Sequence, residues 1–338
     1  MRAGLPTFVF LIAAAGVVAF LALRMGGNYK GLEKGLADTT TSPAMVTWSG
    51  DIRVMTANVR ISEPTDGINA WPNRREYLVK TLLKYGPDVI GCQEMTPAQG
   101  VYLVKELGKW YDHYPKPGVG KVERLENTSG NLSGAVDELF TSLNTLFYRT
   151  DRFEIVDGES GLVIPEQLQA DATENTFFTL AVLRKILAVG SPKPADLLIV
   201  VDTHIRYKES FALKCVARIR GKIGEMQKKY PEAKVVLMGD MNHPKGSKIY
   251  AAIAGGGNAT TDVVGTLTDS FDYSKKRPGD AWGNWHAFTG TPQAQWPTDL
   301  IFAGTGLTAK RTEIVRDHDS NNRYPSDHFF VMTDLANP

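Results

Sequence analysis

The sequence predicts an α/β domain with a largely buried sheet. Short apolar runs rich in β-branched residues alternate with longer stretches of helical character, an alternation that is typical of α/β folds. Hydrophobic residues make up 43% of the 338 residues and charged residues 22%, which is the balance of a globular protein rather than a disordered one. Because no linker is recognisable between residues 48 and 337, we expect one domain there.

Three segments carry the signals of helices. Pro72 suits the first turn of a helix, and the apolar residues that follow share one face until Gly86-Pro87 ends it. Residues 96–99 have capping-box spacing with a proline at the first helical position, which predicts a helix as far as about residue 108. A third helical stretch covers residues 210–230.

Seven apolar runs are expected as strands. The first, at 52–59, is rich in β-branched side chains, and the second, at 88–92, is short and bounded by turn residues, as buried strands are. The other five runs lie at 197–201, 235–238, 300–302, 313–315 and 329–332.

Charge and cysteine content exclude several classes of protein. The chain has 38 basic and 37 acidic residues, and a net charge of +1 argues against binding that depends mainly on phosphate-backbone electrostatics. The two cysteines, Cys92 and Cys215, cannot build a disulfide framework or a four-cysteine zinc site. The sequence has no internal repeat, so a solenoid is excluded as well.

Residues 1–24 are expected to form an N-terminal membrane anchor or a signal peptide. The uncharged run from Leu5 to Leu23 is long enough to span a bilayer. It also fits a secretory signal, but Ala22-Leu23 runs directly into Arg24, which makes a poor cleavage site. We favour the uncleaved anchor, and we expect the domain to lie outside the cytoplasm, membrane-anchored or secreted. Basic residues on both sides of the run leave its orientation open.

Residues 25–47 are expected to be a flexible linker. They contain glycine pairs and a Thr-Ser-Pro stretch but no apolar periodicity. The folded domain is therefore expected at residues 48–338.

Polar side chains lie at or near one end of five of the apolar runs. In four runs they lie at the end or follow it, and in the last they precede it. Because the ends of neighbouring strands gather at one edge of a sheet, and loops there carry chemistry, these side chains indicate a site. Each one alone has an ordinary explanation as a turn residue, a helix-start acid or a core histidine, so the prediction depends on the whole set. The residues are Asn58, Glu94, Asp202, His204, Asp240, Asn242, Asp327 and His328.

These segments, taken in order, resemble the motifs of the endonuclease/exonuclease/phosphatase family of metal-dependent phosphoesterases. Residues 66–71 with Arg74-Arg75, and residues 285–288, further resemble its bacterial branch. The resemblance implies a four-layer α/β sandwich like that of deoxyribonuclease I, with two packed mixed sheets flanked by helices. The matching segments are 52–58, 87–94, Asp202-Thr203-His204, 237–242, 298–302 and 325–328.

The resemblance also implies a metal site made of oxygen ligands. Glu94 is the leading ligand, Asn58 lies close to the metal or the phosphate, and Asp327 adds to a second metal position. Carboxylate and amide oxygens suit Mg²⁺ or Mn²⁺, and Ca²⁺ stays an alternative. Whether one metal ion or two are used is left open.

Five residues are implied as catalytic. Asp240 activates or orients the attacking water, and Asn242 holds that water or the phosphate. His204 donates a hydrogen bond to a phosphate oxygen. Asp299 pairs with His328 and keeps it protonated, because an adjacent carboxylate raises the pKa of a histidine. His328 then stabilises the pentavalent state.

Three further residues are candidates for substrate binding. Arg206 stands where relatives carry an acidic residue, and it either grips a second phosphate or lies on the surface. Trp285 and His286 belong to a glycine-containing loop, in which a tryptophan either reaches a bilayer interface or packs under the loop. Residues 116–136 and 157–180 match no family pattern, so the substrate is not assigned.

The function implied is hydrolysis of a phosphodiester or phosphomonoester by in-line attack of an activated water. The substrate is a small molecule, a lipid or a nucleic acid, and no protein partner is implied. The alternatives are a nonspecific nuclease acting on DNA or RNA and a sphingomyelinase-like lipid phosphodiesterase. A nuclease is less favoured because the sequence has no basic stripe with interleaved aromatic residues. A catalytically inactive, membrane-tethered binding module is the alternative of another class.

Overall fold

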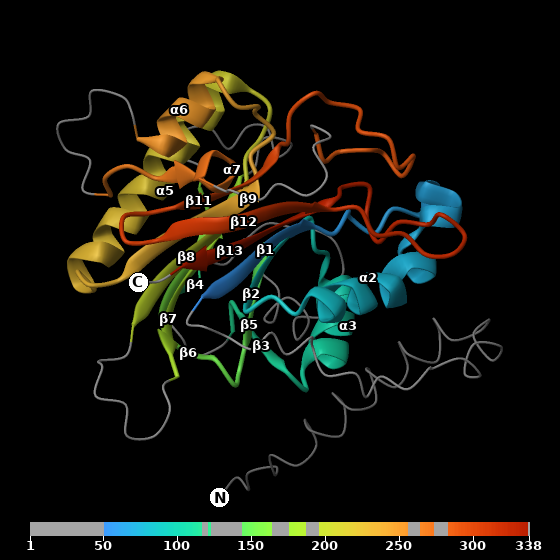
Figure 1. Ribbon diagram of the computed structural model, residues 1–338, viewed down its shortest axis with the longest axis horizontal. Coiled ribbons are helices and arrows are strands. Elements are labelled where there is room, and N and C mark those ends of the chain that lie inside the picture. The colour runs from blue at the N-terminus through green and yellow to red at the C-terminus, as the bar shows by residue number, and fades with distance from the viewer. Residues whose placement is uncertain are drawn as a thin grey trace, which may run out of the picture. The chain divides into compact units, whose positions relative to one another are not determined.

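Two mixed β-sheets pack face to face in the computed structural model, and helices cover the outer face of each sheet (Figure 1). The predicted four-layer sandwich is therefore confirmed. The structure describes residues 51–116, 121–122, 144–163, 176–186, 196–255, 264–273 and 283–336.

The first sheet has six strands within the described residues. Its centre is a parallel pair, β1 and β2, and the remaining neighbours run antiparallel. In spatial order the strands are β12 (Thr308–Val315), β13 (Phe330–Ala336), β1 (Ile52–Asn58), β2 (Val89–Gln93), β5 (Thr145–Arg149) and β3 (Tyr111–Tyr114).

The second sheet has seven strands in the part of the chain that the structure describes. The pair β8 and β9 is parallel, and β11 joins β9 antiparallel. In spatial order the strands are β10 (Thr268–Asp269), β11 (Asp299–Ala303), β9 (Lys234–Asp240), β8 (Leu197–His204), β7 (Phe177–Lys185), β6 (Phe153–Leu162) and β4 (Lys121–Val122).

Helices form the two outer layers. Two of the helices begin or end as the sequence predicted. Gly86 caps α2 in the left-handed conformation, and Thr96 and Gln99 form a capping box at the start of α3. The helices are η1 (Pro64–Asn69), α2 (Trp71–Tyr85), α3 (Pro97–Leu107), α5 (Glu209–Lys229), α6 (Lys248–Ala254) and α7 (Ser270–Tyr273).

Three apolar clusters separate the four layers. One lies between the two sheets and includes Val54, Val200 and Met238. A second packs α5 and α6 against the second sheet, and a third packs α2 and α3 against the first. Burial of both faces explains why the central strands have continuous apolar sequences instead of alternating ones.

Two glycines allow the close approach of backbone and side chains next to the site. A Cβ on Gly239, whose φ is +146°, would lie 1.8 Å from the Thr203 carbonyl oxygen on the neighbouring strand. A Cβ on Gly91 would lie 2.4 Å from Asp202 Oδ1, across the space between the sheets. The first approach keeps β8 and β9 in the register that places Asp240 opposite His204.

Six strands of the described residues were not expected from the sequence: β3, β4, β5, β6, β7 and β10. The pair β6–β7 occupies part of the region 157–180 that matches no family pattern. β6 is irregular, because its register shifts between Ile155 and Asp157 and a Cβ on Gly158 would lie 2.5 Å from the Tyr114 ring. This bulge interrupts the period-two pattern that identifies a strand.

The described residues contain no helix that is long and apolar enough to cross a membrane. The predicted anchor at 1–24 and the predicted linker at 25–47 lie outside the described residues. Most of residues 116–136 and the segment 164–175 also lie outside them.

Candidate active site

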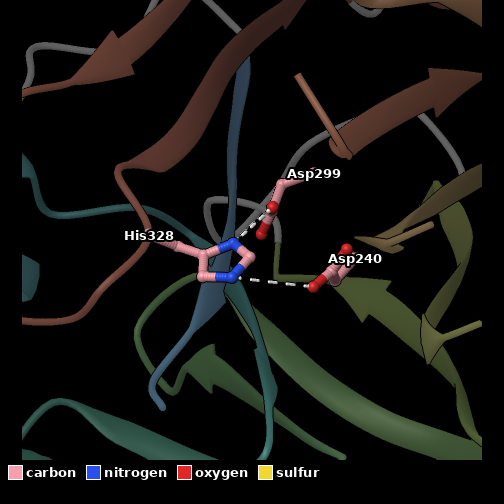
Figure 2. Close-up of side chains that lie close together, drawn as sticks. All are labelled: Asp240, Asp299 and His328. Carbon is pink, nitrogen blue, oxygen red and sulfur yellow. Dashed lines mark hydrogen bonds and ion pairs between the residues drawn. The ribbon is translucent and has the colours of Figure 1, made fainter. Parts of the chain in front are cut away.

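Asp240, Asp299 and His328 converge between the two sheets (Figure 2). Asp240 ends β9, Asp299 begins the neighbouring β11, and His328 lies two residues before β13 of the other sheet. His328 Nδ1 lies 2.9 Å from Asp299 Oδ2, and its Nε2 lies 3.9 Å from Asp240 Oδ2. The imidazole thus bridges the two sheets and directs Nε2 towards Asp240.

Asp299 holds His328 in a fixed orientation and keeps it charged. Asp299 Oδ2 also accepts hydrogen bonds from the Asn284 amide at 2.5 Å and the Thr298 hydroxyl at 3.3 Å. Burial alone would lower the pKa of His328, but the charge and hydrogen bond of Asp299, with Asp240 and Asp327 nearby, raise that pKa to about 10. His328 is therefore an imidazolium at neutral pH.

Asp240 is a buried carboxylate that is kept ionised. Its Oδ2 lies 3.6 Å from His204 Nε2 and accepts a hydrogen bond from the Asn58 amide at 3.1 Å, while Oδ1 accepts the Asn242 N–H at 3.0 Å. Burial works to raise the pKa of Asp240, but His204, His328 and these hydrogen bonds lower it below its ordinary value.

Asn242 fixes the His204 ring against Asp240. The Asn242 amide nitrogen lies 2.9 Å from His204 Nε2 and donates to the Ile205 carbonyl at 2.8 Å. Asn242 has a φ of +52°, a left-handed conformation that asparagine tolerates better than most residues. The segment Gly239–Asn242 therefore forms a tight turn that places the Asp240 and Asn242 side chains beside His204 Nε2.

Glu94, Asn58 and Asp327 line the adjoining part of the site. The Asn58 amide donates to Glu94 Oε1 at 3.1 Å as well as to Asp240, so it joins the two carboxylates. Glu94 Oε2 accepts the Ile61 N–H at 3.0 Å. Asp327 is anchored by Ser326, whose hydroxyl donates to the Asn58 carbonyl at 2.6 Å and lies 3.3 Å from Asp327 Oδ1. Eight of the predicted positions thus lie in one connected cluster: Asn58, Glu94, His204, Asp240, Asn242, Asp299, Asp327 and His328.

A model of the endonuclease/exonuclease/phosphatase family matches residues 186–328 of the chain, the part that contributes Asp240, Asp299 and His328 to this cluster. Solved structures of the same family superpose on most of the chain. The chain is similar to the endonuclease/exonuclease/phosphatase family over these residues and shares the fold of solved members. Members of this family hydrolyse phosphoester bonds and generally depend on divalent metal ions.

Several members of the family share this fold at low sequence identity. A family protein from Bacteroides thetaiotaomicron is 20% identical, with 85% of this chain and 98% of that chain covered and a TM-score of 0.66. The mannosyl-6-phosphatase of the same organism is 20% identical, with 84% and 99% covered and a TM-score of 0.66. The D. rerio TDP2, solved with a single-strand DNA product, is 17% identical, with 85% and 99% covered and a TM-score of 0.55.

A curated relative extends beyond the matched region. The probable CCR4-Not complex 3'-5'-exoribonuclease subunit Ccr4 of Encephalitozoon cuniculi is 22% identical over 295 residues. The match covers 78% of this chain and 56% of the relative, so the chain spans about half the length of that protein.

The Glu94 side of the site fits a divalent metal ion better than the Asp299 side. Burial raises the pKa of Asp327, and the like charge of Glu94 raises it further, so a cation between them would relieve a real repulsion. Asp240, Asp299 and His328 also place their ligand atoms within 4.8 Å of one another. However, His328 is protonated and its Nδ1 is bonded to Asp299, so it offers no lone pair to a metal.

Backbone strain is concentrated around the site. Among the described residues that are not glycine, Arg60, Glu94, Asn242, Ala287 and Phe288 have positive φ and lie on loops next to it. Such conformations persist only where surrounding contacts impose them. The loops are thus held in place by tertiary contacts, and not by local propensity.

The three candidate substrate residues differ in their placement. Trp285 forms a β-bridge with His328 and is 40% exposed, so of the two placements left open the one packed under the loop does not apply. Arg206 is half-buried, and its carbonyl lies 3.0 Å from His243 Nε2. The prediction that His286 contacts substrate needs correction, because this side chain is fully buried and stacks on Phe329 at 4.0 Å.

Two residues that the sequence analysis missed support the site. Arg60 pairs with Asp66 at 3.0 Å, and its Nε lies 3.9 Å from Asp327 Oδ2. Asn284 holds Asp299 through its amide. Arg60 lies two residues after Asn58, and Asn284 directly precedes Trp285, but neither residue belongs to a recognisable motif.

The His328–Asp299 pair predicts a pH-dependent stability. The pKa of His328 is about 10 in the folded protein, above its ordinary 6.5, so the folded state binds this proton more tightly than the unfolded chain does. The stabilisation is fully present below the unfolded pKa and is lost as the pH rises through the folded pKa. We expect the free energy of unfolding of chelator-treated protein, measured with urea, to fall across this window, and to fall less in Asp299→Asn. Equal slopes in the two proteins would contradict the ion pair.

Proposed function

We propose that the protein is a metal-dependent phosphoesterase that hydrolyses its substrate by in-line attack of an activated water. The observation that carries this proposal is the ionised Asp240, held between His204, Asn242 and His328. It lies next to Asn58, Glu94 and Asp327, the group that we call the Glu94 pocket. A carboxylate in this position can accept a proton from water or orient it, and the His328 imidazolium beside it can stabilise an anionic transition state.

Each group has a distinct part in the proposed reaction. Glu94 and Asp327 would hold a Mg²⁺ or Mn²⁺ ion, which when bound would neutralise charge on the phosphoryl oxygens, and the Asn58 amide would orient the Glu94 carboxylate. Asp240 would orient the water, with Asn242 fixing the carboxylate. The His328 imidazolium would donate from Nε2 to a phosphoryl oxygen as negative charge develops there.

The surface next to the site favours a substrate that carries a ring or another apolar group. Tyr207 is 73% exposed and lies three residues after His204; burial raises its pKa, and the charges of Asp240 and Glu94 raise it further. Trp285 is exposed beside His328, and Ile61 is exposed beside Glu94. Exposed aromatic side chains provide stacking surfaces for sugars and bases and can enter a lipid interface.

We therefore place a small phosphate ester or a phospholipid ahead of a polynucleotide. The net charge of +1 supports this order, because nucleic-acid binding usually requires a basic surface. A lipid substrate would also agree with the proposed anchoring of the protein to a membrane, outside the cytoplasm, through residues 1–24. A nuclease is the second candidate, supported by the single-strand DNA product in the D. rerio TDP2 structure. An inactive binding module is disfavoured because every predicted catalytic side chain is present and connected.

The test is hydrolysis by the purified full-length chain in Mg²⁺ or Mn²⁺, with EDTA as the control. Bis-p-nitrophenyl phosphate, p-nitrophenyl phosphate, a mannose 6-phosphate, plasmid DNA and sphingomyelin vesicles would be compared side by side. We expect EDTA to abolish hydrolysis of at least one substrate and added metal to restore it. Hydrolysis that is insensitive to EDTA would refute the metal mechanism, and preferred cleavage of DNA would reverse the order of substrates.

A further inference from the structure

Arg74 is a buried arginine in the first turn of α2, with 2% of its surface exposed. All its hydrogen bonds with the described residues go to backbone carbonyl oxygens, and together they use the donors of Nε, Nη1 and Nη2. The acceptors are Val59 at 2.6 Å, Arg60 at 2.7 Å, Asn69 at 3.0 Å, Pro325 at 3.0 Å and Ile61 at 3.5 Å.

These five carbonyls belong to three separate segments of the chain. Residues 59–61 follow β1, Asn69 ends η1, and Pro325 precedes the segment that carries Asp327 and His328. The carbon between the guanidinium nitrogens also lies 5.2 Å from the centre of the Trp71 ring and 5.7 Å from that of Phe288, which adds the loop after Trp285. One side chain therefore ties together the segments that surround the Glu94 pocket.

One of the tied segments carries Asp327, and another holds the Glu94 carboxylate through a hydrogen bond. The Ile61 carbonyl accepts from Arg74, while the Ile61 N–H donates to Glu94 Oε2 at 3.0 Å. Pro325 lies one residue before Ser326, whose hydroxyl orients Asp327. Arg74 is thus linked to Glu94 through the backbone of Ile61. It is linked to Asp327 through Pro325 and Ser326.

We propose that Arg74 is a positioning residue that sets the separation of Glu94 and Asp327 and thereby the affinity of the pocket for a divalent metal ion. This inference rests on the proposed function. The guanidinium also places a positive charge behind two carboxylates that would otherwise repel each other when no metal is bound.

Only arginine has the geometry for this role. Its planar group offers five N–H donors in a fixed arrangement, whereas a lysine ammonium offers three from a single point. Arg74→Lys would keep the charge but could not bond to all three segments at once. The conservative variant therefore separates geometry from charge.

Arg220 provides a matched control. It is also a buried arginine that donates to two backbone carbonyls, those of Ile253 at 2.6 Å and Gly265 at 2.7 Å. Those segments contribute no residue to the site. Replacing Arg220 should destabilise the fold in a comparable way without changing the positions of Glu94 and Asp327.

The experiment measures Mn²⁺ binding by calorimetry and by electron paramagnetic resonance in the full-length chain and in Arg74→Ala, Arg74→Lys and Arg220→Lys. We expect both Arg74 variants to raise the Mn²⁺ dissociation constant by roughly 10–100-fold, as loss of groups that orient ligands does. Arg220→Lys should leave that constant within about twofold while lowering the melting temperature. Methylguanidinium, but not methylurea, should restore Mn²⁺ affinity to Arg74→Ala by filling the vacated space.

The outcomes separate this inference from the proposed function. Wild-type Mn²⁺ affinity in folded Arg74→Lys would overturn the positioning role alone. If Arg74→Ala does not fold, Arg74→Lys and its comparison with Arg220→Lys decide the question. Equal losses of affinity in Arg74→Lys and Arg220→Lys would show a general effect of stability and refute the inference. No Mn²⁺ binding by the wild-type chain would refute the proposed metal mechanism itself, and the role of Arg74 with it.

Discussion

Asp240→Asn is expected to lower kcat by roughly 10³–10⁴-fold while the protein keeps its fold. The change preserves the size of the side chain but removes the negative charge that faces His204 Nε2 at 3.6 Å and His328 Nε2 at 3.9 Å. A neutral amide cannot take a proton from water. The expected factor corresponds to about 4–5.5 kcal/mol of transition-state stabilisation. It would be measured by steady-state kinetics on the best substrate of the panel.

The fold should survive this change at a modest cost. An asparagine can still accept the Asn242 N–H, but its amide would face the Asn58 amide, and loss of that hydrogen bond costs about 1 kcal/mol. Asp269→Asn is the matched control, because Asp269 is also a buried acid but bonds to Tyr250 and the Phe271 N–H, away from the site. Near-normal turnover by Asp240→Asn, or an equal loss in Asp269→Asn, would contradict the role assigned to Asp240.

The candidate catalytic cluster could be predicted because its residues lie at or near the ends of strands of the two sheets. Asn58 and Asp240 each close a parallel strand, and the ends of such strands meet wherever the sheets are packed together. The sequence marks these positions clearly, since an apolar run stops at a polar residue. The residues of the strands themselves are buried on both faces, which makes the runs easy to recognise.

The surroundings of the cluster could not be predicted in the same way. His286 lies in a loop next to exposed Trp285, and no periodicity tells which of the two side chains points inwards. Arg60 and Glu94 depend on positive φ values that tertiary contacts impose and that local propensity does not indicate. Arg74 sits on a helix whose face pattern suggests only packing, and its carbonyl partners come from segments far apart in the sequence.

The site has two parts that differ in how their charges are balanced. Asp299 and His328 form a buried ion pair that Asn284 supports, whereas burial and the like charge of Glu94 raise the pKa of Asp327, which favours a cation there. The first part is complete in the protein alone. Its contribution to catalysis can therefore be measured separately from metal binding, through the two residues of the ion pair.

His328→Gln is expected to lower kcat by roughly 10²–10³-fold with little change in KM. Glutamine retains a hydrogen-bond donor but not the charge that His328 presents beside Asp240. Asp299→Asn should have a smaller effect, because it leaves the imidazole in place and lowers the pKa of His328 towards its ordinary value. Its activity should then decline with rising pH well before that of the wild-type protein does, as measured from the pH dependence of kcat.

We expect Asp299 to act on the reaction through His328, since its Oδ2 contacts the imidazole, as Figure 2 shows, and is otherwise bonded to Asn284 and Thr298. The double variant His328→Gln/Asp299→Asn should therefore be no slower than His328→Gln, a coupling that a double-mutant cycle measures directly. If the two losses of activity multiply, Asp299 has a role of its own and the ion pair does not explain its effect. If the losses do not multiply, the Asp299→Asn change lowers activity only while His328 is present, as expected of a carboxylate that does not contact the substrate.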